Sequence, residues 1–89
     1  MKIVRKVKVA NLLGLHTRPA ASIVKLLQPW KSSVSFTYKS ETINARSIMS
    51  ILMLAEKKNA MIEITIEGED AEMTMSQLVS AFEQEFGEK

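Results

Sequence analysis

The sequence predicts an α+β domain in which helices pack on one face of an antiparallel sheet. Three short segments carry apolar side chains at every second position, which is typical of strands with one buried face. Three others carry them at the spacing of amphipathic helices. The predicted order is β-α-β-β-α-β-α. Because each helix has one apolar face, we expect the helices on one side of the sheet and polar side chains on the other.

The strands are expected at residues 3–9, 34–38, 41–44 and 62–67. The clearest alternation is in the last of them, where Ile62, Ile64 and Ile66 are separated by polar residues. Lys39 and Ser40 form the expected hairpin tip between the second and third strands.

The helices are expected at residues 17–28, 47–54 and 71–86. Pro29 ends the first helix, because a proline disfavours the helical conformation in the residue before it. The second helix is short, and its apolar side includes Ala55. The apolar stripe of the third helix extends to Phe86. A turn is expected at residues 57–59.

Composition limits the range of functions. A chain of 89 residues has room for one domain, which we place at residues 1–89. The absence of cysteine excludes disulfides, thiol catalysis and Cys-ligated metals, and a single histidine excludes a multi-histidine metal site. No apolar run is long enough to cross a membrane, and the first residues do not resemble a signal peptide. We therefore expect a soluble, cytoplasmic protein.

Charge is distributed unevenly along the chain. Residues 1–46 carry nine Lys and Arg and one acid, a net charge of +8, whereas residues 47–89 carry a net charge of −6. A cationic first half suits an anionic ligand or an acidic partner. Attraction between the two halves within the fold explains the same pattern, and charge alone does not decide between these readings.

The segment from Gly14 to Pro19 has the composition of an anion site. His16 directly precedes the first helix, and Pro19 lies in its first turn, where a missing N–H costs no hydrogen bond. The free amides and the helix dipole at such an end stabilise an anion. Arg18 adds a cation suited to phosphate oxygens, and Gly14 lets the loop bend sharply.

Two roles for His16 remain open from the residues alone. A neutral imidazole is a nucleophile near pH 7, so His16 could carry a phosphoryl group beside the anion site. It could also be an ordinary N-cap or loop residue. The segment contains no Ser, Cys or carboxylate nucleophile beside His16, so a self-contained enzyme is the least favoured interpretation.

The second candidate segment surrounds Ser47. A serine before an apolar helical run is a typical N-cap, and a phosphate at the same position is also electrostatically tolerated. A helix of two turns cannot bury all of Ile48, Met49, Leu52 and Met53. We expect some of them to be exposed as an adaptable docking surface.

Both segments resemble the signatures of HPr, the histidine-containing phosphocarrier family of the bacterial phosphoenolpyruvate:sugar phosphotransferase system. Gly14-Leu15-His16-Thr17-Arg18-Pro19-Ala20 is similar to the active-site signature of that family, and Ile43-Asn44-Ala45-Arg46-Ser47-Ile48-Met49 is similar to its serine-phosphorylation signature. The resemblance covers essentially the whole chain. It implies an open-faced β-sandwich, with a four-stranded antiparallel sheet covered on one face by three helices.

The resemblance also implies roles for individual residues. His16 would accept a phosphoryl group at Nδ1 from phosphorylated enzyme I and pass it to enzyme IIA domains, and Arg18 would help to neutralise the phosphate. Ser47 would be a regulatory site for an HPr kinase/phosphorylase. The remaining implied roles are phosphate binding by Gly14, Thr17 and Pro19, and docking of partners, including catabolite regulators, by Ile48, Met49 and Leu52. A monomer is expected, with no cofactor and no metal.

Two other functions remain as alternatives. One is a regulatory HPr-like protein that acts mainly through Ser47 without sugar transport. The other is a small RNA-binding module, since some of these share the β-α-β-β-α-β order and a basic surface. The RNA-binding reading is disfavoured because Phe36 and Tyr38 are expected to face the core with Val34 rather than to stack on bases. We therefore expect no nucleic-acid partner.

Overall fold

The computed structural model describes residues 1–54 and 57–88, and it has the predicted order of elements with one short addition at the end. The strands are β1 (Lys2–Lys8), β2 (Ser33–Tyr38), β3 (Glu41–Asn44) and β4 (Met61–Glu67). The helices are α1 (Thr17–Leu27), α2 (Ile48–Leu54), α3 (Ala71–Glu83) and the 3-10 helix η1 (Glu85–Gly87). Ala55, which the sequence places on the apolar side of α2, lies outside the described residues.

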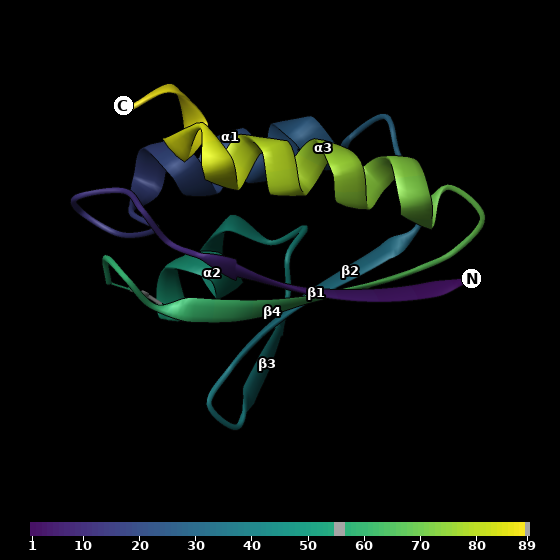
Figure 1. Ribbon diagram of the computed structural model, residues 1–89, viewed down its shortest axis with the longest axis horizontal. Coiled ribbons are helices and arrows are strands. Elements are labelled where there is room, and N and C mark those ends of the chain that lie inside the picture. The colour runs from purple at the N-terminus through teal and green to yellow at the C-terminus, as the bar shows by residue number, and fades with distance from the viewer. Residues whose placement is uncertain (55–56, 89) are drawn as a thin grey trace.

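The four strands form one antiparallel sheet in the order β1-β4-β2-β3 (Figure 1). β4 is therefore central and pairs with both β1 and β2. Its three isoleucines, Ile62, Ile64 and Ile66, are fully buried. Val7 of β1 lies opposite Ile62, and Phe36 of β2 lies opposite Ile64, so the apolar side chains of the three strands share one face.

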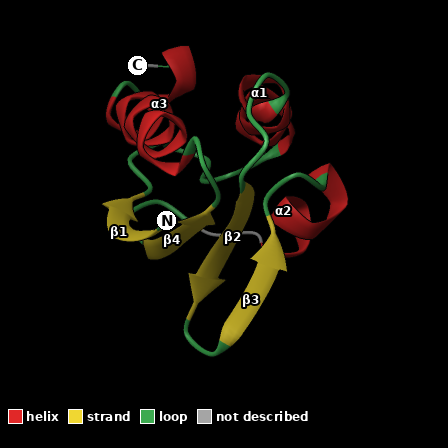
Figure 2. Ribbon diagram, turned by 90° about the vertical axis from the view of Figure 1, so that its right-hand side faces the viewer, coloured by secondary structure: helices red, strands yellow, loops and turns green. Residues whose placement is uncertain are grey.

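The helices lie on that face, and the opposite face of the sheet is open (Figure 2). α1 and α3 lie across the sheet, and α2 packs against α1 and β3. The predicted four-stranded sheet with helices on one side is confirmed. Within residues 1–54 and 57–88, no helix combines the length and the apolar character needed to cross a bilayer. The buried apolar core is formed by Val7, Val9, Leu15, Ala20, Ile23, Leu27, Val34, Phe36, Ala45, Ile51, Leu54, Ile62, Ile64, Ile66, Ala71, Met75, Leu78 and Phe82.

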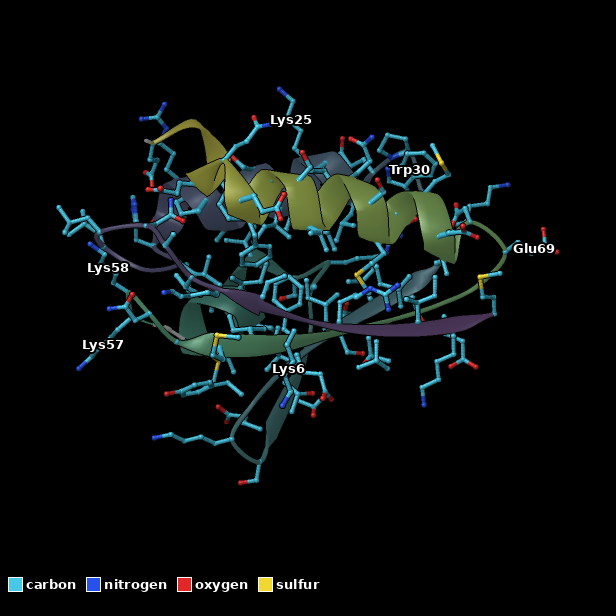
Figure 3. All side chains as sticks on the ribbon, viewed as in Figure 1. Lys6, Lys25, Trp30, Lys57, Lys58 and Glu69 are labelled. Atoms are coloured by element: carbon cyan, nitrogen blue, oxygen red, sulfur yellow. The ribbon has the colours of Figure 1, made fainter. Side chains whose placement is uncertain are left out.

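The open face carries polar and charged side chains. Lys6 lies opposite Glu63 in the register of β1 and β4, and it points away from the helices (Figure 3). The hydroxyls of Thr37 and Thr42 are 2.8 Å apart across the hairpin of β2 and β3. Arg5, which interrupts the alternation of β1, lies opposite buried Ile64 and is exposed at the sheet edge. This exposure explains how a charge is accommodated on the helix side.

The end of the chain differs from the prediction. The helix expected over residues 71–86 ends at Glu83, and the chain then bends into η1. Glu85 and Phe86 both have a φ of 52°, which is left-handed and incompatible with a continued α-helix. The ring of Phe86 packs edge-to-face on Phe82, with centroids 4.9 Å apart. The apolar spacing correctly indicated that Phe86 packs on the core, but its helical conformation was predicted wrongly.

Arg46 connects the segment before α2 to the end of α1. Its guanidinium donates to the backbone carbonyl oxygens of Leu27, Trp30 and Ser32 at 2.9, 2.6 and 2.8 Å. A cation at the C-terminal end of a helix satisfies carbonyls that have no partner within the helix and is also favoured by the helix dipole. This arginine therefore fixes where α2 begins relative to α1.

Asp70, just before α3, makes a similar connection. Its carboxylate accepts hydrogen bonds from the backbone N–H groups of Lys31 at 2.7 Å and Ser32 at 3.0 Å, and from the hydroxyls of Ser32 and Thr74. These bonds, led by that of the Lys31 amide, lower the pKa of Asp70 from 3.8 to about 2. They stabilise the ionised form and hold the loop between α1 and β2 against the start of α3.

A pH-dependent contribution to stability is expected from Asp70. Because the pKa is lower in the folded state, the contribution is present above 3.8 and is lost as the pH falls toward about 2. As the pH falls from 3.8 to about 2, the free energy of unfolding measured in urea should therefore decrease less for Asp70→Asn than for the unchanged protein. Glu69→Gln is a matched control because Glu69 is exposed and points into solvent (Figure 3). Identical pH profiles for Asp70→Asn and the unchanged protein would contradict this assignment.

Candidate functional site

The loop between β1 and α1 is fixed at its start, at its centre and just before His16. At its start, the amide of Val9 donates to Ala60 at 2.9 Å and its carbonyl accepts from Asn59 at 2.7 Å. At its centre, the amide of Gly14 donates to the carbonyl of Asn11 at 3.0 Å, with a φ of 68° that favours glycine. Leu15 then inserts into the core. This anchoring determines where the next residue, His16, is presented.

His16 occupies the N-cap position of α1. Its backbone is extended, and its carbonyl accepts the first helical hydrogen bond, from Ala20 at 3.0 Å. The side chain of His16 does not cap the helix. Thr17 and Arg18 follow as exposed first-turn residues, and buried Pro19 contributes no N–H. The positive end of the helix is thus presented beside the imidazole.

The imidazole of His16 is one-third exposed and contacts a carboxylate from the far end of the chain. Its Nε2 lies 2.9 Å from Glu88 Oε2 and 3.2 Å from Glu88 Oε1. Sequence reasoning missed Glu88, because 72 residues separate the two and no spacing pattern connects them. The contact depends on the bend after α3, which the apolar spacing of the sequence does not indicate.

Asn11 holds this carboxylate in place. Its Nδ2 donates to Glu88 Oε1 at 2.6 Å and to the carbonyl of Glu85 at 2.8 Å. Asn11 is fully buried, and its Oδ1 has no hydrogen-bond partner among the described residues. The sequence analysis did not single out Asn11, although a buried amide in a loop requires such partners. Through Asn11, the loop before α1 is therefore hydrogen-bonded both to η1 and to the carboxylate that contacts His16.

Arg18 lies at the rim of a depression of about 360 Å³ that is lined by Leu12, Leu13, His16, Arg18, Gly87 and Glu88. Within residues 1–54 and 57–88, Arg18 forms no ion pair, so its guanidinium is available to an incoming anion. The same residues contain no group of three or more His, Cys, Asp or Glu side chains placed to bind a metal. The arrangement can bind a phosphate through a cation and helix amides.

Ser47 caps α2, as its position in the sequence predicted. Its Oγ accepts a hydrogen bond from the amide of Ser50 at 3.2 Å, and its carbonyl accepts one from Ile51 at 3.0 Å. The side chain is partly exposed. The structure therefore places Ser47 at the start of the helix that packs beside α1. Neither of these two hydrogen bonds connects Ser47 to the site around His16.

Apolar side chains are exposed on both segments. Ile48 is 38% exposed and Met49 is 71% exposed, whereas Leu52 is partly buried against the core. Leu12 and Leu13, in the loop beside His16, are 78% and 72% exposed. Sequence reasoning did not single out these two leucines, although adjacent leucines in a predicted loop next to the histidine were a usable signal. Exposed apolar residues grouped in this way are typical of interaction surfaces.

Comparison with known proteins matches residues 3–84 to the family model described as PTS HPr component phosphorylation site. The chain is 44% identical over 80 residues to the phosphocarrier protein HPr of Chlamydia muridarum, covering 90% of this chain and 77% of that protein. A crystal structure of HPr-C-His from Thermoanaerobacter tengcongensis matches with a TM-score of 0.93 and 31% identity, covering 98% of both chains.

A crystal structure of an HPr dimer from the same organism matches with a TM-score of 0.77 and 32% identity, covering 91% of this chain and 93% of that one. The family model spans nearly the whole chain, and the relatives are similar to it in sequence and in fold. The protein therefore belongs to the HPr family of phosphocarrier proteins of the phosphotransferase system.

Proposed function

We propose that the protein carries a phosphoryl group on His16, which it accepts from phosphorylated enzyme I and transfers to enzyme IIA domains. The observation that supports this most directly is the position of His16. A partly exposed imidazole lies at the start of α1, and its own side chain leaves the end of the helix uncapped. A phosphoryl group bound to that ring meets unpaired backbone amides and the positive end of the helix dipole.

Arg18 and the first turn of α1 stabilise the phosphate without trapping it. Arg18 offers a planar pair of donors to two phosphate oxygens, and it is exposed enough to release them. Thr17 provides a first-turn amide, Gly14 shapes the approach, and Pro19 fixes the backbone of the turn. Phosphoryl transfer depends mainly on positioning and charge stabilisation, which these residues provide. The partner proteins supply the remaining groups, so the protein acts as a carrier in a relay rather than as an enzyme.

The first test is phosphorylation with phosphoenolpyruvate, Mg²⁺ and an enzyme I, followed by intact mass measurement before and after mild acid. The unchanged protein should gain one acid-labile phosphate, because phosphoramidates hydrolyse in acid. His16→Ala should gain none. Ser47→Ala is the control and should still gain the phosphate. If the unchanged protein gains no phosphate from an enzyme I that is active on another HPr, the carrier function is wrong, and a regulatory protein acting mainly through Ser47 becomes the better interpretation.

Ser47 is proposed as a regulatory site for an HPr kinase/phosphorylase. It is partly exposed, and a phosphate there would lie at the start of α2, where a negative charge is tolerated. The same phosphate would place about two negative charges beside exposed Ile48 and Met49. A partner that docks on this surface with acidic groups would then be repelled.

Ser47→Asp should therefore raise the enzyme I concentration needed for half-maximal phosphorylation of His16 by roughly tenfold. Ser80→Asp, on the exposed side of α3, is the matched control and should behave like the unchanged protein. The measurement is the initial rate of His16 phosphorylation against enzyme I concentration. Equal curves for the two variants would contradict the proposed regulation.

The docking surface is proposed to comprise Ile48, Met49 and Leu52, extended by Leu12 and Leu13. Leu52 contributes less accessible area than predicted, because it packs partly into the core. Met49 is the most exposed of the three residues on α2. Its flexible side chain suits a surface that binds several different partners, including enzyme I, enzyme IIA and catabolite regulators.

Replacing Met49 by Glu should weaken the binding of enzyme I by roughly tenfold, since it puts a charge into an apolar contact and that charge also repels acidic groups of the partner. Met73→Glu on α3 is the matched control, because Met73 is also exposed, at 56%, but lies outside the proposed surface. The dissociation constants can be measured by calorimetry. A loss of the same size in both variants would show that the effect is not specific to this surface.

The alternative of an RNA-binding module gains no support. Phe36 is fully buried, and Tyr38 packs against the core from the helix side of the sheet, so neither offers a platform for bases. The monomeric state, the cytoplasmic location and the lack of a nucleic-acid partner remain predictions.

A further inference from the structure

We propose that Glu88 is the positioning residue for His16. Its carboxylate keeps the ring proton on Nε2, so that Nδ1 presents its lone pair to the incoming phosphoryl group. This inference rests on the proposed carrier function and adds the residue that selects the reactive nitrogen. It also explains why a carboxylate lies close to a histidine at a site for anions.

The geometry fixes the direction of the hydrogen bond. Glu88 Oε2 lies 2.9 Å from Nε2 of His16. An ionised carboxylate has no proton to donate, so the nitrogen that faces it must be the donor. A neutral imidazole has only one N–H group. When Nε2 carries the proton, Nδ1 is left with a free lone pair and is the nucleophilic atom of the ring.

The carboxylate is held in place rather than resting loosely on the surface. Its side chain is only 17% exposed, and Asn11 Nδ2 donates to its Oε1 at 2.6 Å. The amide of Glu88 donates to the carbonyl of Glu85 at 2.9 Å, and that same carbonyl accepts from Asn11 at 2.8 Å. One buried amide therefore fixes both the backbone turn and the carboxylate. A histidine partner supported in this way by a second group keeps the ring in one orientation.

The proposed step balances without any movement of a proton. The Nδ1 lone pair forms the N–P bond while the bond from phosphorus to the donor protein breaks, and its electron pair leaves with the donor. The proton stays on Nε2, so the ring becomes a cation whose charge Glu88 offsets. On transfer, a lone pair of a nucleophile on the acceptor forms the new bond to phosphorus while the N–P bond breaks, and the electron pair of the N–P bond returns to Nδ1. The site therefore needs no general base, and a protonated ring is a good leaving group in the second transfer.

A purely structural role for Glu88, as an anchor for η1 through Asn11, predicts something different. In that case the ring would be free to exchange its proton between the two nitrogens, and only stability would depend on Glu88. Glu88→Gln separates the two roles. The glutamine oxygen can still accept from Asn11, but its amide group can donate to Nε2 as readily as its oxygen can accept. The anchor is kept, and the control over the ring proton is lost.

The experiment compares Glu88→Gln with Glu85→Gln. The control removes the same charge three positions away and leaves the Glu85 carbonyl in place. ¹⁵N shifts of His16, at a pH where the ring is neutral, report which nitrogen carries the proton. The maximal rate of His16 phosphorylation by phosphorylated enzyme I is measured alongside. We expect the proton on Nε2 in the unchanged protein and in Glu85→Gln, and a mixture of tautomers in Glu88→Gln. Its maximal rate should be roughly tenfold lower.

Several outcomes would overturn the inference while leaving the carrier function intact. One is a phosphorylated Glu88→Gln whose maximal rate and ring shifts match those of the control. Another is a lower rate that is accompanied by loss of folded structure and by no change of tautomer in the folded fraction. In contrast, failure of the unchanged protein to accept phosphate at all would overturn the proposed function itself, and this inference with it.

Discussion

The pairing of β4 with two neighbours is the constraint on which the rest of the structure depends. β4 is the last strand in the sequence, yet it is hydrogen-bonded to β1 on one edge and to β2 on the other. Its three isoleucines are fully buried beneath the helices. Where β4 begins, the backbone around Ala60 also bonds to Val9 and so fixes the start of the loop that carries His16. The sheet therefore positions the start of the loop that carries His16.

The depression beside His16 combines the start of a helix with one arginine rather than with a dense cluster of cations. The first half of the chain carries a net charge of +8, but its charges are used in different ways. Arg46 is committed to three backbone carbonyls, Lys6 lies on the open face of the sheet, and Arg18 alone of the three lines the depression beside His16. At least one of these cations, Arg46, therefore has a structural role, since its hydrogen bonds hold backbone of the same half of the chain.

Local patterns predicted most of the fold, because the elements obey simple periodicities. The alternation of Ile62, Ile64 and Ile66 and the cap at Ser47 are properties of short segments, and both are confirmed. The left-handed turn at Phe86 could not be predicted, since apolar spacing records which side a residue packs on and not its backbone conformation. The contact between His16 and Glu88 could not be predicted either, because it depends on the path of the backbone after α3 and not on any sequence motif.

The pairing of β1 with β4 also determines when the site around His16 can form during folding. Lys2 lies opposite Glu67, so residues 65 positions apart in the sequence must meet before the sheet is complete. Contacts between residues far apart in sequence slow folding, because the entropy of closing the loop is lost before the contacts are gained. The site around His16 needs the end of β1, the start of β4 and the turn after α3 at the same time. The site around His16 therefore assembles only when segments from both halves of the chain have folded together.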